Sequence, residues 1–164
     1  MAEENMVSGA EFDPTRRYRY LLWREWGRAD HRVLFVLLNP STADEQVNDP
    51  TIRRCLGFAR TWGYGAMDAC NLFAYRTPYP AALREASAPV GPDNDKWIEF
   101  AVKRAATVVV AWGVHGALMG RHESMIQLLS RWKPLYCFGR TQQGFPKHPL
   151  YLPSAQPLIL YAPP

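Results

Sequence analysis

Side chains that could bind a ligand or assist a reaction are concentrated in three short segments of the sequence. The first is the turn Asn39-Pro40-Ser41-Thr42. Pro40 fixes its own φ and biases Asn39 away from the helical region, so the Asn39 amide keeps one orientation. Ser41 and Thr42 add hydroxyl groups and backbone N–H donors suited to a phosphate or a base oxygen. The turn is equally typical of a strand end capped by Ser and Thr.

The second segment begins at Asn71, which ends a hydrophobic stretch, and continues to Arg76. A buried amide needs hydrogen-bond partners, and the edge of a nucleobase is one natural partner. Phe73 and Tyr75 could stack on a ring, and Arg76 could pair with a phosphate. Alternatively, Asn71 binds loop backbone and the two aromatic residues belong to the core or its rim. Arg76 would then pair with a local carboxylate.

The third segment is His148-Pro149, in a polar, proline-rich stretch near the C-terminus. A histidine there can donate a hydrogen bond to an oxygen that gains negative charge, although a lone loop histidine is more often only solvated. The other histidines show no mutual spacing typical of a metal site, and we interpret them as structural or surface residues: His31, His115 and His122.

An acidic cluster lies beside the first turn and consists of Asp44, Glu45 and Asp49. It could supply a general base or bind Mg²⁺, but such residues more often cap a helix. Other chemistries lack their motifs, since the sequence has no GxGxxG, no GxxxxGK[ST] and no GxSxG. The cysteines have no zinc or iron–sulfur spacing and are interpreted as reduced, buried thiols of a cytoplasmic protein: Cys55, Cys70 and Cys137.

Alternating strands and helices must position these segments. Residues 33–38 are a continuous apolar run, which is typical of a strand buried on both faces and favours parallel pairing. Further strands are predicted at 66–72, 107–112 and 135–138, with an opening strand at 18–26 and an edge strand at 158–161. Helices are predicted at 50–61 with Asp49 as N-cap, at 80–86, from Asp93 onward and at 116–131. The pattern predicts a three-layer α/β sandwich with a central, mainly parallel sheet of about four strands.

In such sheets, ligands bind outside the carboxyl ends of the strands. The three polar segments follow the strands predicted at 33–38, 66–72 and 135–138. We therefore expect Asn39, Asn71 and His148 to line one cleft.

Length and composition indicate a folded, single-domain protein. The chain has 164 residues, of which 48% are hydrophobic and 21% charged. Residues 1–17 lack an apolar signal core and are predicted to be a loose N-terminal tail, followed by one α/β domain over 18–164. No apolar run approaches the ~20 residues that a membrane helix needs, so no membrane partner is expected. The formal charge of +4 and the pI of about 9.1 favour a polyanionic partner only mildly.

The order of the motifs resembles that of the uracil-DNA glycosylase superfamily, especially its mismatch-specific branch. There a strand runs into a Gly-x-Asn-Pro-Gly turn, which is matched here by Leu38-Asn39-Pro40-Ser41. The Thr-Asn-Leu-Val and Arg-Pro-Thr stretches are matched by Cys70-Asn71-Leu72-Phe73 and Arg76-Thr77-Pro78. The last motif, His-Pro-Ser, is matched by His148-Pro149-Leu150, and the agreement covers residues 32–152. Leu38, Ser41 and Leu150 depart from the family pattern.

The resemblance implies a uracil-DNA glycosylase-like fold, DNA as partner, and hydrolysis of the N-glycosidic bond of a damaged or modified base without a metal or other cofactor. By this resemblance, Asn39 positions the water, Asn71 reads the base edge and His148 stabilises the anionic base oxygen. The remaining residues of the implied substrate-binding set are Pro40, Ser41, Thr42, Phe73, Tyr75, Arg76 and Pro149.

Two alternatives stay open beside this interpretation. One is a non-catalytic nucleotide or nucleic-acid binding module on the same fold. The other is an enzyme that acts on a free nucleotide or small metabolite through the acidic cluster. The segments LNPSTAD, NDPTIRRC, WGYG and NLFAYR are also similar to an uncharacterised bacterial family, domain of unknown function 1643, whose membership implies no activity.

Overall fold

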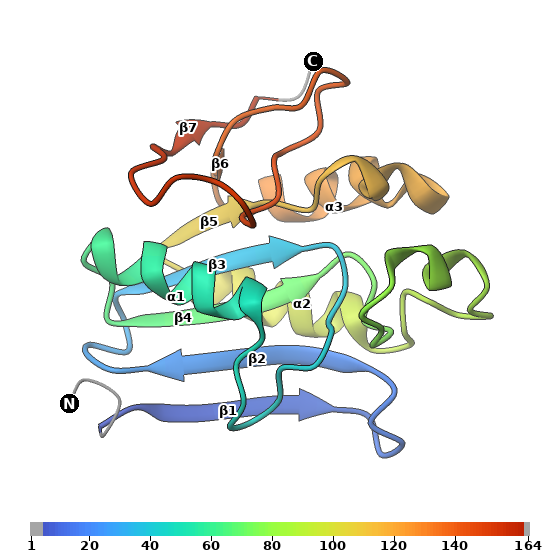
Figure 1. Ribbon diagram of the computed structural model, residues 1–164, viewed down its shortest axis with the longest axis horizontal. Helices are drawn as coiled ribbons and strands as arrows, with labels where there is room; N and C mark the ends of the chain where they lie inside the picture. Colours follow the sequence, from blue (N-terminus) through green and yellow to red (C-terminus); the bar gives the residue numbers. More distant parts are fainter. Residues whose placement is uncertain (1–4, 163–164) are drawn as a thin grey trace.

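The apolar runs of the sequence pair into one mixed sheet of seven strands, in the order β1-β2-β4-β3-β5-β6-β7 (Figure 1). The computed structural model describes residues 5–162. The four central strands β4, β3, β5 and β6 are parallel, whereas β1, β2 and β7 run antiparallel to their neighbours. The strands are β1 (Val7–Phe12), β2 (Arg19–Glu25), β3 (Arg32–Leu37), β4 (Ala66–Asn71), β5 (Thr107–Val110), β6 (Leu135–Cys137) and β7 (Ile159–Leu160).

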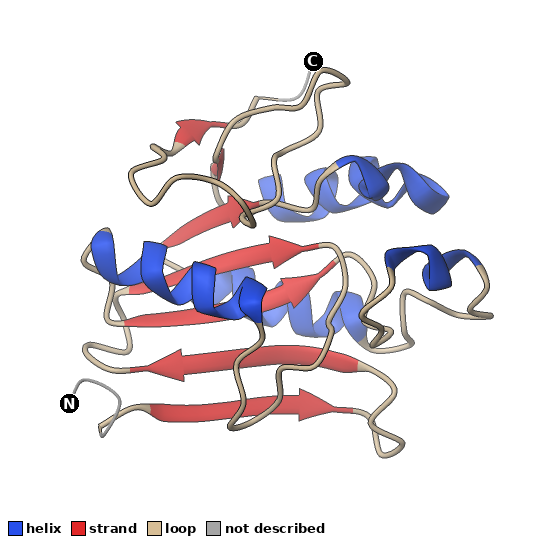
Figure 2. Cartoon of the chain, in the orientation of Figure 1, coloured by secondary structure: helices blue, strands red, loops and turns tan. Residues whose placement is uncertain are grey.

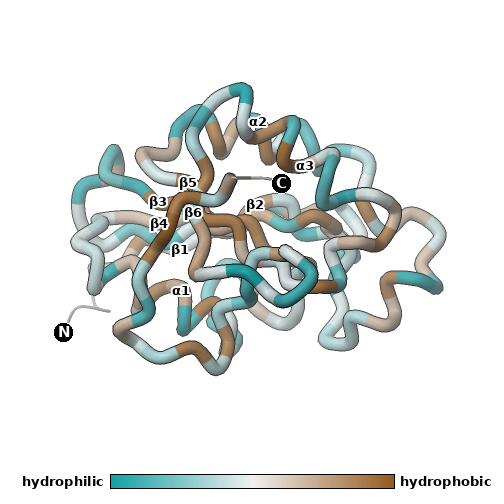
Figure 3. The backbone as a smooth tube through the Cα atoms, turned by 90° about the horizontal axis from the view of Figure 1, so that it is seen from above, coloured by the Kyte–Doolittle hydropathy of each residue, from teal (hydrophilic) through white to brown (hydrophobic). Residues whose placement is uncertain are grey.

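Helices cover both faces of this sheet (Figures 2 and 3). Helix α1 (Pro50–Thr61) lies on one face, and α2 (Asn94–Arg104) and α3 (Arg121–Ser130) lie on the other. Along β3, Val33 and Phe35 pack with α1, while Leu34 and Val36 pack with α2 and α3. Because successive side chains of a strand point to opposite faces and helices cover both, β3 is apolar at every position from Val33 to Leu37.

Helix α1 begins where its capping residues predict. The Asp49 carboxylate accepts a hydrogen bond from the Ile52 N–H at 2.9 Å, and Pro50 is the first helical residue. Gly63, at φ +85°, follows the helix in a conformation that favours glycine. The Asp49 carboxylate also accepts from the Ala43 N–H at 3.2 Å, which ties the amino end of α1 to the segment after β3.

The sheet is larger than the four strands predicted, and part of the predicted N-terminal tail belongs to it. Residues of β1 pair with β2 from Val7, opposite Glu25, to Phe12, opposite Arg19. The prediction of a loose tail over 1–17 was therefore wrong for 7–12, while residues 1–4 lie outside the described part of the chain. Gly9 packs closely under Trp23, because a Cβ there would lie 2.1 Å from the ring unless that side chain moved.

The helix predicted over 116–131 is interrupted. A 3₁₀ helix, η2 (Val114–Gly120), ends where Leu118 is extended and Met119 is left-handed at φ 57°, and α3 begins at Arg121. The helix predicted at 80–86 is also a 3₁₀ helix, η1 (Pro80–Arg84). Both short helices follow strands of the parallel set and extend its carboxyl edge.

A bulge in β2 turns one arginine toward the loop that follows β3. Glu11 lies opposite Leu21 and Phe12 opposite Arg19, which leaves Tyr20 as the additional residue. The buried Arg19 guanidinium then donates to the Ala43 carbonyl at 3.1 Å. Burial lowers the pKa of Arg19 to about 10, and the nearby Asp49 carboxylate opposes this shift.

All three cysteines are buried free thiols. Cys55 lies in α1, Cys70 in β4 and Cys137 in β6. Burial raises the pKa of each thiol above its usual range. Over residues 5–162, no helix combines the length and apolar character needed to cross a bilayer.

Candidate functional site

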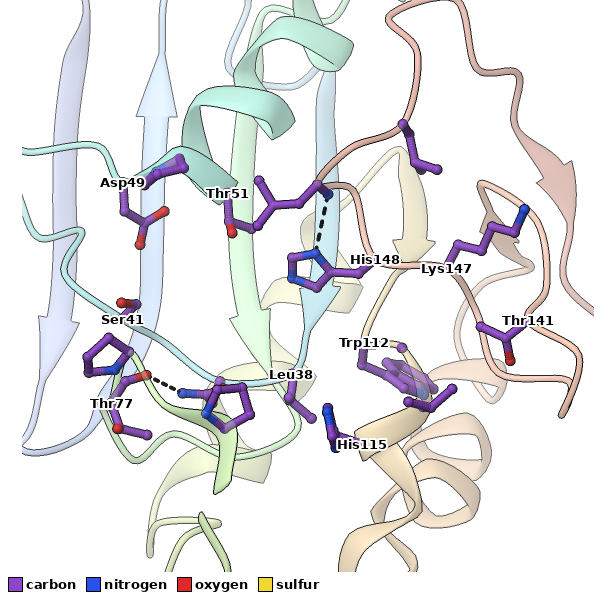
Figure 4. Close-up of a pocket in the computed structure, with 18 residues that line it drawn as sticks. Leu38, Ser41, Asp49, Thr51, Thr77, Trp112, His115, Thr141, Lys147 and His148 are labelled. Atoms are coloured by element: carbon purple, nitrogen blue, oxygen red, sulfur yellow. Dashed lines mark hydrogen bonds between the residues drawn. The ribbon is translucent and has the colours of Figure 1, made fainter. Parts of the chain in front are cut away.

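The carboxyl ends of the four parallel strands surround one cavity with a volume of about 720 Å³ (Figure 4). Its walls come from the segments that follow β3, β4, β5 and β6, which are distant in sequence. This is the edge at which ligands bind in parallel α/β sheets. The lining residues with polar or aromatic side chains are Asn39, Ser41, Asp49, Thr51, Thr77, Trp112, His115, Thr141, Lys147 and His148.

Asn39 is held rigidly at this cavity. Its Nδ2 group donates to the Pro40 carbonyl at 3.0 Å and to the Thr77 carbonyl at 2.8 Å. The Thr77 N–H in turn donates to the Pro40 carbonyl at 2.9 Å, so the ends of β3 and β4 are joined. Both Nδ2 hydrogens are engaged, and the Oδ1 atom of Asn39 is left as its acceptor for a water or ligand.

Asp49 places a carboxylate in the same cavity. The side chain is buried, and its two oxygens accept from the Ile52 N–H at 2.9 Å and from the Ala43 N–H at 3.2 Å. Thr51, in the first turn of α1, adds a hydroxyl group beside it (Figure 4). The helix amino end favours negative charge, which suits an ionised carboxylate at this position.

His148 comes from the loop after β6 and lies between Asp49 and Lys147 in the view of Figure 4. Its Nδ1 accepts from the Leu150 N–H at 3.2 Å, so the neutral ring carries its hydrogen on Nε2. Burial lowers the pKa of His148, and Asp49 partly opposes that shift. A neutral imidazole with a fixed Nε2–H is a hydrogen-bond donor that keeps its orientation.

Trp112 forms the wall after β5. It is almost fully buried, and its Nε1–H donates to Nδ1 of His122 at 2.9 Å. The next residue, Gly113, donates its N–H to the Pro146 carbonyl at 2.8 Å and so joins this wall to the loop that carries His148. Sequence reasoning missed Trp112 and Thr51, although the strand-end rule applied to β5 would have indicated the former.

Asn39, Ser41 and His148 are brought together as predicted, but Asn71 is not among the residues that line the cavity. Asn71 is 1% exposed, and neither polar atom of its side chain has a hydrogen-bond partner among the described residues. Its backbone carbonyl accepts from Asn94 Nδ2 at 2.9 Å. The prediction of a shared cleft was therefore wrong for Asn71, which is enclosed within the fold.

Several other predicted binding residues also lie outside the cavity lining. Phe73 is a fully buried member of the core that packs against α2 and α3, and Tyr75 packs edge-on against Tyr18. Arg76 donates to the Ser41 and Arg16 carbonyls and so supports the turn instead of facing the cavity. The others are the buried Pro40 and Pro149 and the exposed Thr42.

The loop between β3 and α1, which carries Asp49, is bound by Arg24, a fully buried arginine of β2. Its guanidinium donates to the Asp44 carbonyl at 2.7 Å, to the Val47 carbonyl at 3.2 Å and to Asn48 Oδ1 at 3.0 Å. These three bonds tie the loop to β2. Among residues 5–162, no three His, Cys, Asp or Glu side chains are grouped closely enough to hold a metal ion.

Comparison with protein families places this sequence in a family. The family described as "Protein of unknown function (DUF1643)" matches residues 19–150, which span β2 to the cavity loop after β6. Searches of curated proteins and of solved structures gave no match. Because the match covers most of the sequence and all four strand ends at the cavity, the chain belongs to the DUF1643 family.

Proposed function

We propose that this cavity hydrolyses the N-glycosidic bond of a nucleobase, with a damaged or modified base in DNA as the expected substrate. The observation that carries the proposal is the placement of Asn39, Asp49 and His148 in one cavity, from three separate segments. Its volume of about 720 Å³ is of the size of small-molecule sites.

The three side chains supply what such a cleavage needs. The C–N bond breaks through an oxocarbenium-like state while the base leaves with negative charge. The Nε2–H of His148 donates to a base oxygen that gains this charge. Asn39 Oδ1 and the Asp49 carboxylate orient a water whose oxygen bonds to the anomeric carbon, and Asp49 accepts the water proton. The departing base then takes up a proton.

Base recognition in this proposal differs from the sequence expectation. Asn71 is enclosed, so the ring is read by groups that line the cavity, chiefly the hydroxyls of Ser41, Thr51 and Thr141. Lys147 is the cationic side chain at the cavity and is the candidate contact for a phosphate. We also propose that the fold resembles that of the uracil-DNA glycosylases in more than its mixed α/β sheet.

A second candidate is a nucleotide-binding module without catalysis. It is favoured by one observation: each Asp49 oxygen already accepts a backbone N–H, at 2.9 and 3.2 Å, as expected of a purely structural N-cap. In that case the cavity would hold a nucleotide, and no water would be activated.

A single-turnover assay distinguishes the two. Base release and equilibrium binding are measured on a panel of DNA strands and free nucleosides with altered bases. For a substrate that is cleaved, His148→Ala should lower the rate about 10²–10³-fold, since it removes one donor to the developing anion. His31→Ala, an exposed histidine outside the cavity, is the matched control and should cleave like the wild type. Tight binding without release across the panel would support the binding module instead.

A further inference from the structure

A chain of hydrogen bonds runs behind the cavity, through residues that the proposed chemistry does not use. Trp112 Nε1–H donates to His122 Nδ1 at 2.9 Å. His122 Nε2 lies 3.3 Å from the Tyr161 hydroxyl, which donates to the Gly144 carbonyl at 3.1 Å. The chain thus connects a wall of the cavity to the loop 139–148, which carries Lys147 and His148.

The direction of these bonds fixes the protonation of His122. Its Nδ1 accepts from Trp112, so the hydrogen of the neutral ring must be on Nε2 and points to the Tyr161 oxygen. Tyr161 then uses its own hydrogen for Gly144. All donors and acceptors are matched in this one state. A second proton on Nδ1 would set two N–H groups against each other.

Packing leaves these residues little freedom. Trp112 rests against Gly116, where a Cβ would lie 2.3 Å from the indole. The His122 ring meets the edge of Phe145 with the ring centroids 4.8 Å apart. Tyr161 is buried, and its N–H donates to the Leu135 carbonyl of β6 at 2.8 Å. Packing therefore fixes both ends of this series of hydrogen bonds, Trp112 and Tyr161.

We propose that His122 and Tyr161 are positioning residues of the cavity, which hold the Trp112 wall and the loop 139–148 in place and release them when His122 is protonated. These hydrogen bonds make the cavity sensitive to acidic pH. Only their effect on catalysis rests on the proposed function. The ionisable groups around these hydrogen bonds are Glu123 beside His122 on α3, and Arg140, whose guanidinium lies 4.8 Å from the Tyr161 ring, together with Cys137.

Burial lowers the pKa of His122, and Glu123 partly opposes this shift. At neutral pH the ring is therefore uncharged, as the hydrogen bonds require. His148 also titrates with a lowered pKa, so an acid limb in an activity profile alone would not identify the responsible histidine. The test needs a direct view of Trp112 and of the loop.

Hydrogen exchange followed by NMR gives that view without a substrate. We would follow the Trp112 indole N–H and the amides of Gly113 and Lys147, which donate to Pro146 and Gly139. From about pH 7.5 to about pH 5, after correction for intrinsic exchange, wild-type protection should fall through the histidine range. In His122→Asn the amide oxygen replaces Nδ1 as acceptor and does not titrate, so indole protection should stay constant.

Two further variants complete the test. Tyr161→Phe keeps the ring but removes both hydroxyl bonds, so exchange at Lys147 should rise about tenfold at neutral pH, with the indole less affected. His31→Asn is the control and should behave as the wild type. The proposal is overturned if wild-type indole protection does not change with pH, or if it falls equally in His122→Asn. For any substrate that is cleaved, Tyr161→Phe should reduce kcat by up to about 100-fold.

Discussion

Asp49 combines two roles that can be separated by substitution. As N-cap it accepts from the Ile52 N–H at 2.9 Å, and as a lining residue it presents a carboxylate to the cavity. Serine is also a good N-cap, so Asp49→Ser keeps the cap and removes the charge, whereas Asp49→Ala removes both. This pair of variants therefore separates stability from chemistry.

We expect the free energy of unfolding of Asp49→Ala to be about 1 kcal/mol lower than that of Asp49→Ser, because only the alanine variant loses the cap. Base release should fall about 10²–10⁴-fold in both variants, because both lose the carboxylate that we propose activates water. Denaturant unfolding and single-turnover rates measure the two effects. If Asp49→Ser cleaves at the wild-type rate, the carboxylate has no catalytic role.

The lining of the cavity was only partly predicted, because residue types indicate chemistry but not the direction in which a side chain points. Asn39 and His148 were found from turns that follow apolar strands, and both line the cavity. Asn71 also follows this pattern, but strand alternation and its burial place it inside the fold. Trp112 was read as the end of an apolar strand, and its hydrogen bond to His122 depends on a helix that begins nine residues later.

At the scale of elements, prediction succeeded where one local cause decides the structure. The apolar run at 33–38 and the cap at Asp49 gave β3 and α1 to within about a residue. The segment VSGAEF of β1 has no such run, because it is an edge strand that is placed by its pairing with β2. The break at Leu118–Gly120 has no proline, and its single breaker residue, Gly120 at φ 66°, was included in the predicted helix.

The loop between β3 and α1 provides a prediction at this scale. Arg24 is fully buried and binds this loop through three groups, whereas Arg16 binds Glu45 at the surface. Arg24→Met should lower the free energy of unfolding by roughly 2–5 kcal/mol, since buried carbonyls lose their donor. Arg16→Ala should change it little, because exposed ion pairs are weak. Equal midpoints in urea for the two variants would contradict this account.

At the scale of the whole molecule, part of the positive charge is buried. Four arginines are buried, and each binds backbone carbonyls or carboxylates: Arg19, Arg24, Arg32 and Arg121. The net charge of +4 therefore does not describe the surface that a ligand meets. Contacts to an anion depend on the few cations near the cavity, among them Lys147.

Stability of the whole chain should decline in mild acid. The pKa values of His122 and His148 lie below 6.5 in the folded protein, so near that pH the unfolded chain binds more protons. Their contribution is complete above pH 6.5 and is lost as the pH falls through the folded values. Urea midpoints between about pH 8 and about pH 5 test this, before most carboxylates protonate. The urea midpoint should depend less on pH in the double variant His122→Asn, His148→Asn. If its dependence on pH is unchanged, other groups cause the loss of stability.

The buried thiols have a practical consequence for following conformational opening. An alkylating reagent attacks thiolates, so at neutral pH it modifies these cysteines only when the surrounding structure opens. Cys55 reports on α1, Cys70 on the centre of the sheet, and Cys137 on the border with the two-residue strand β7. Mass spectrometry of peptides from the alkylated wild-type protein can therefore follow the opening of three regions separately. We expect Cys137 to be labelled first.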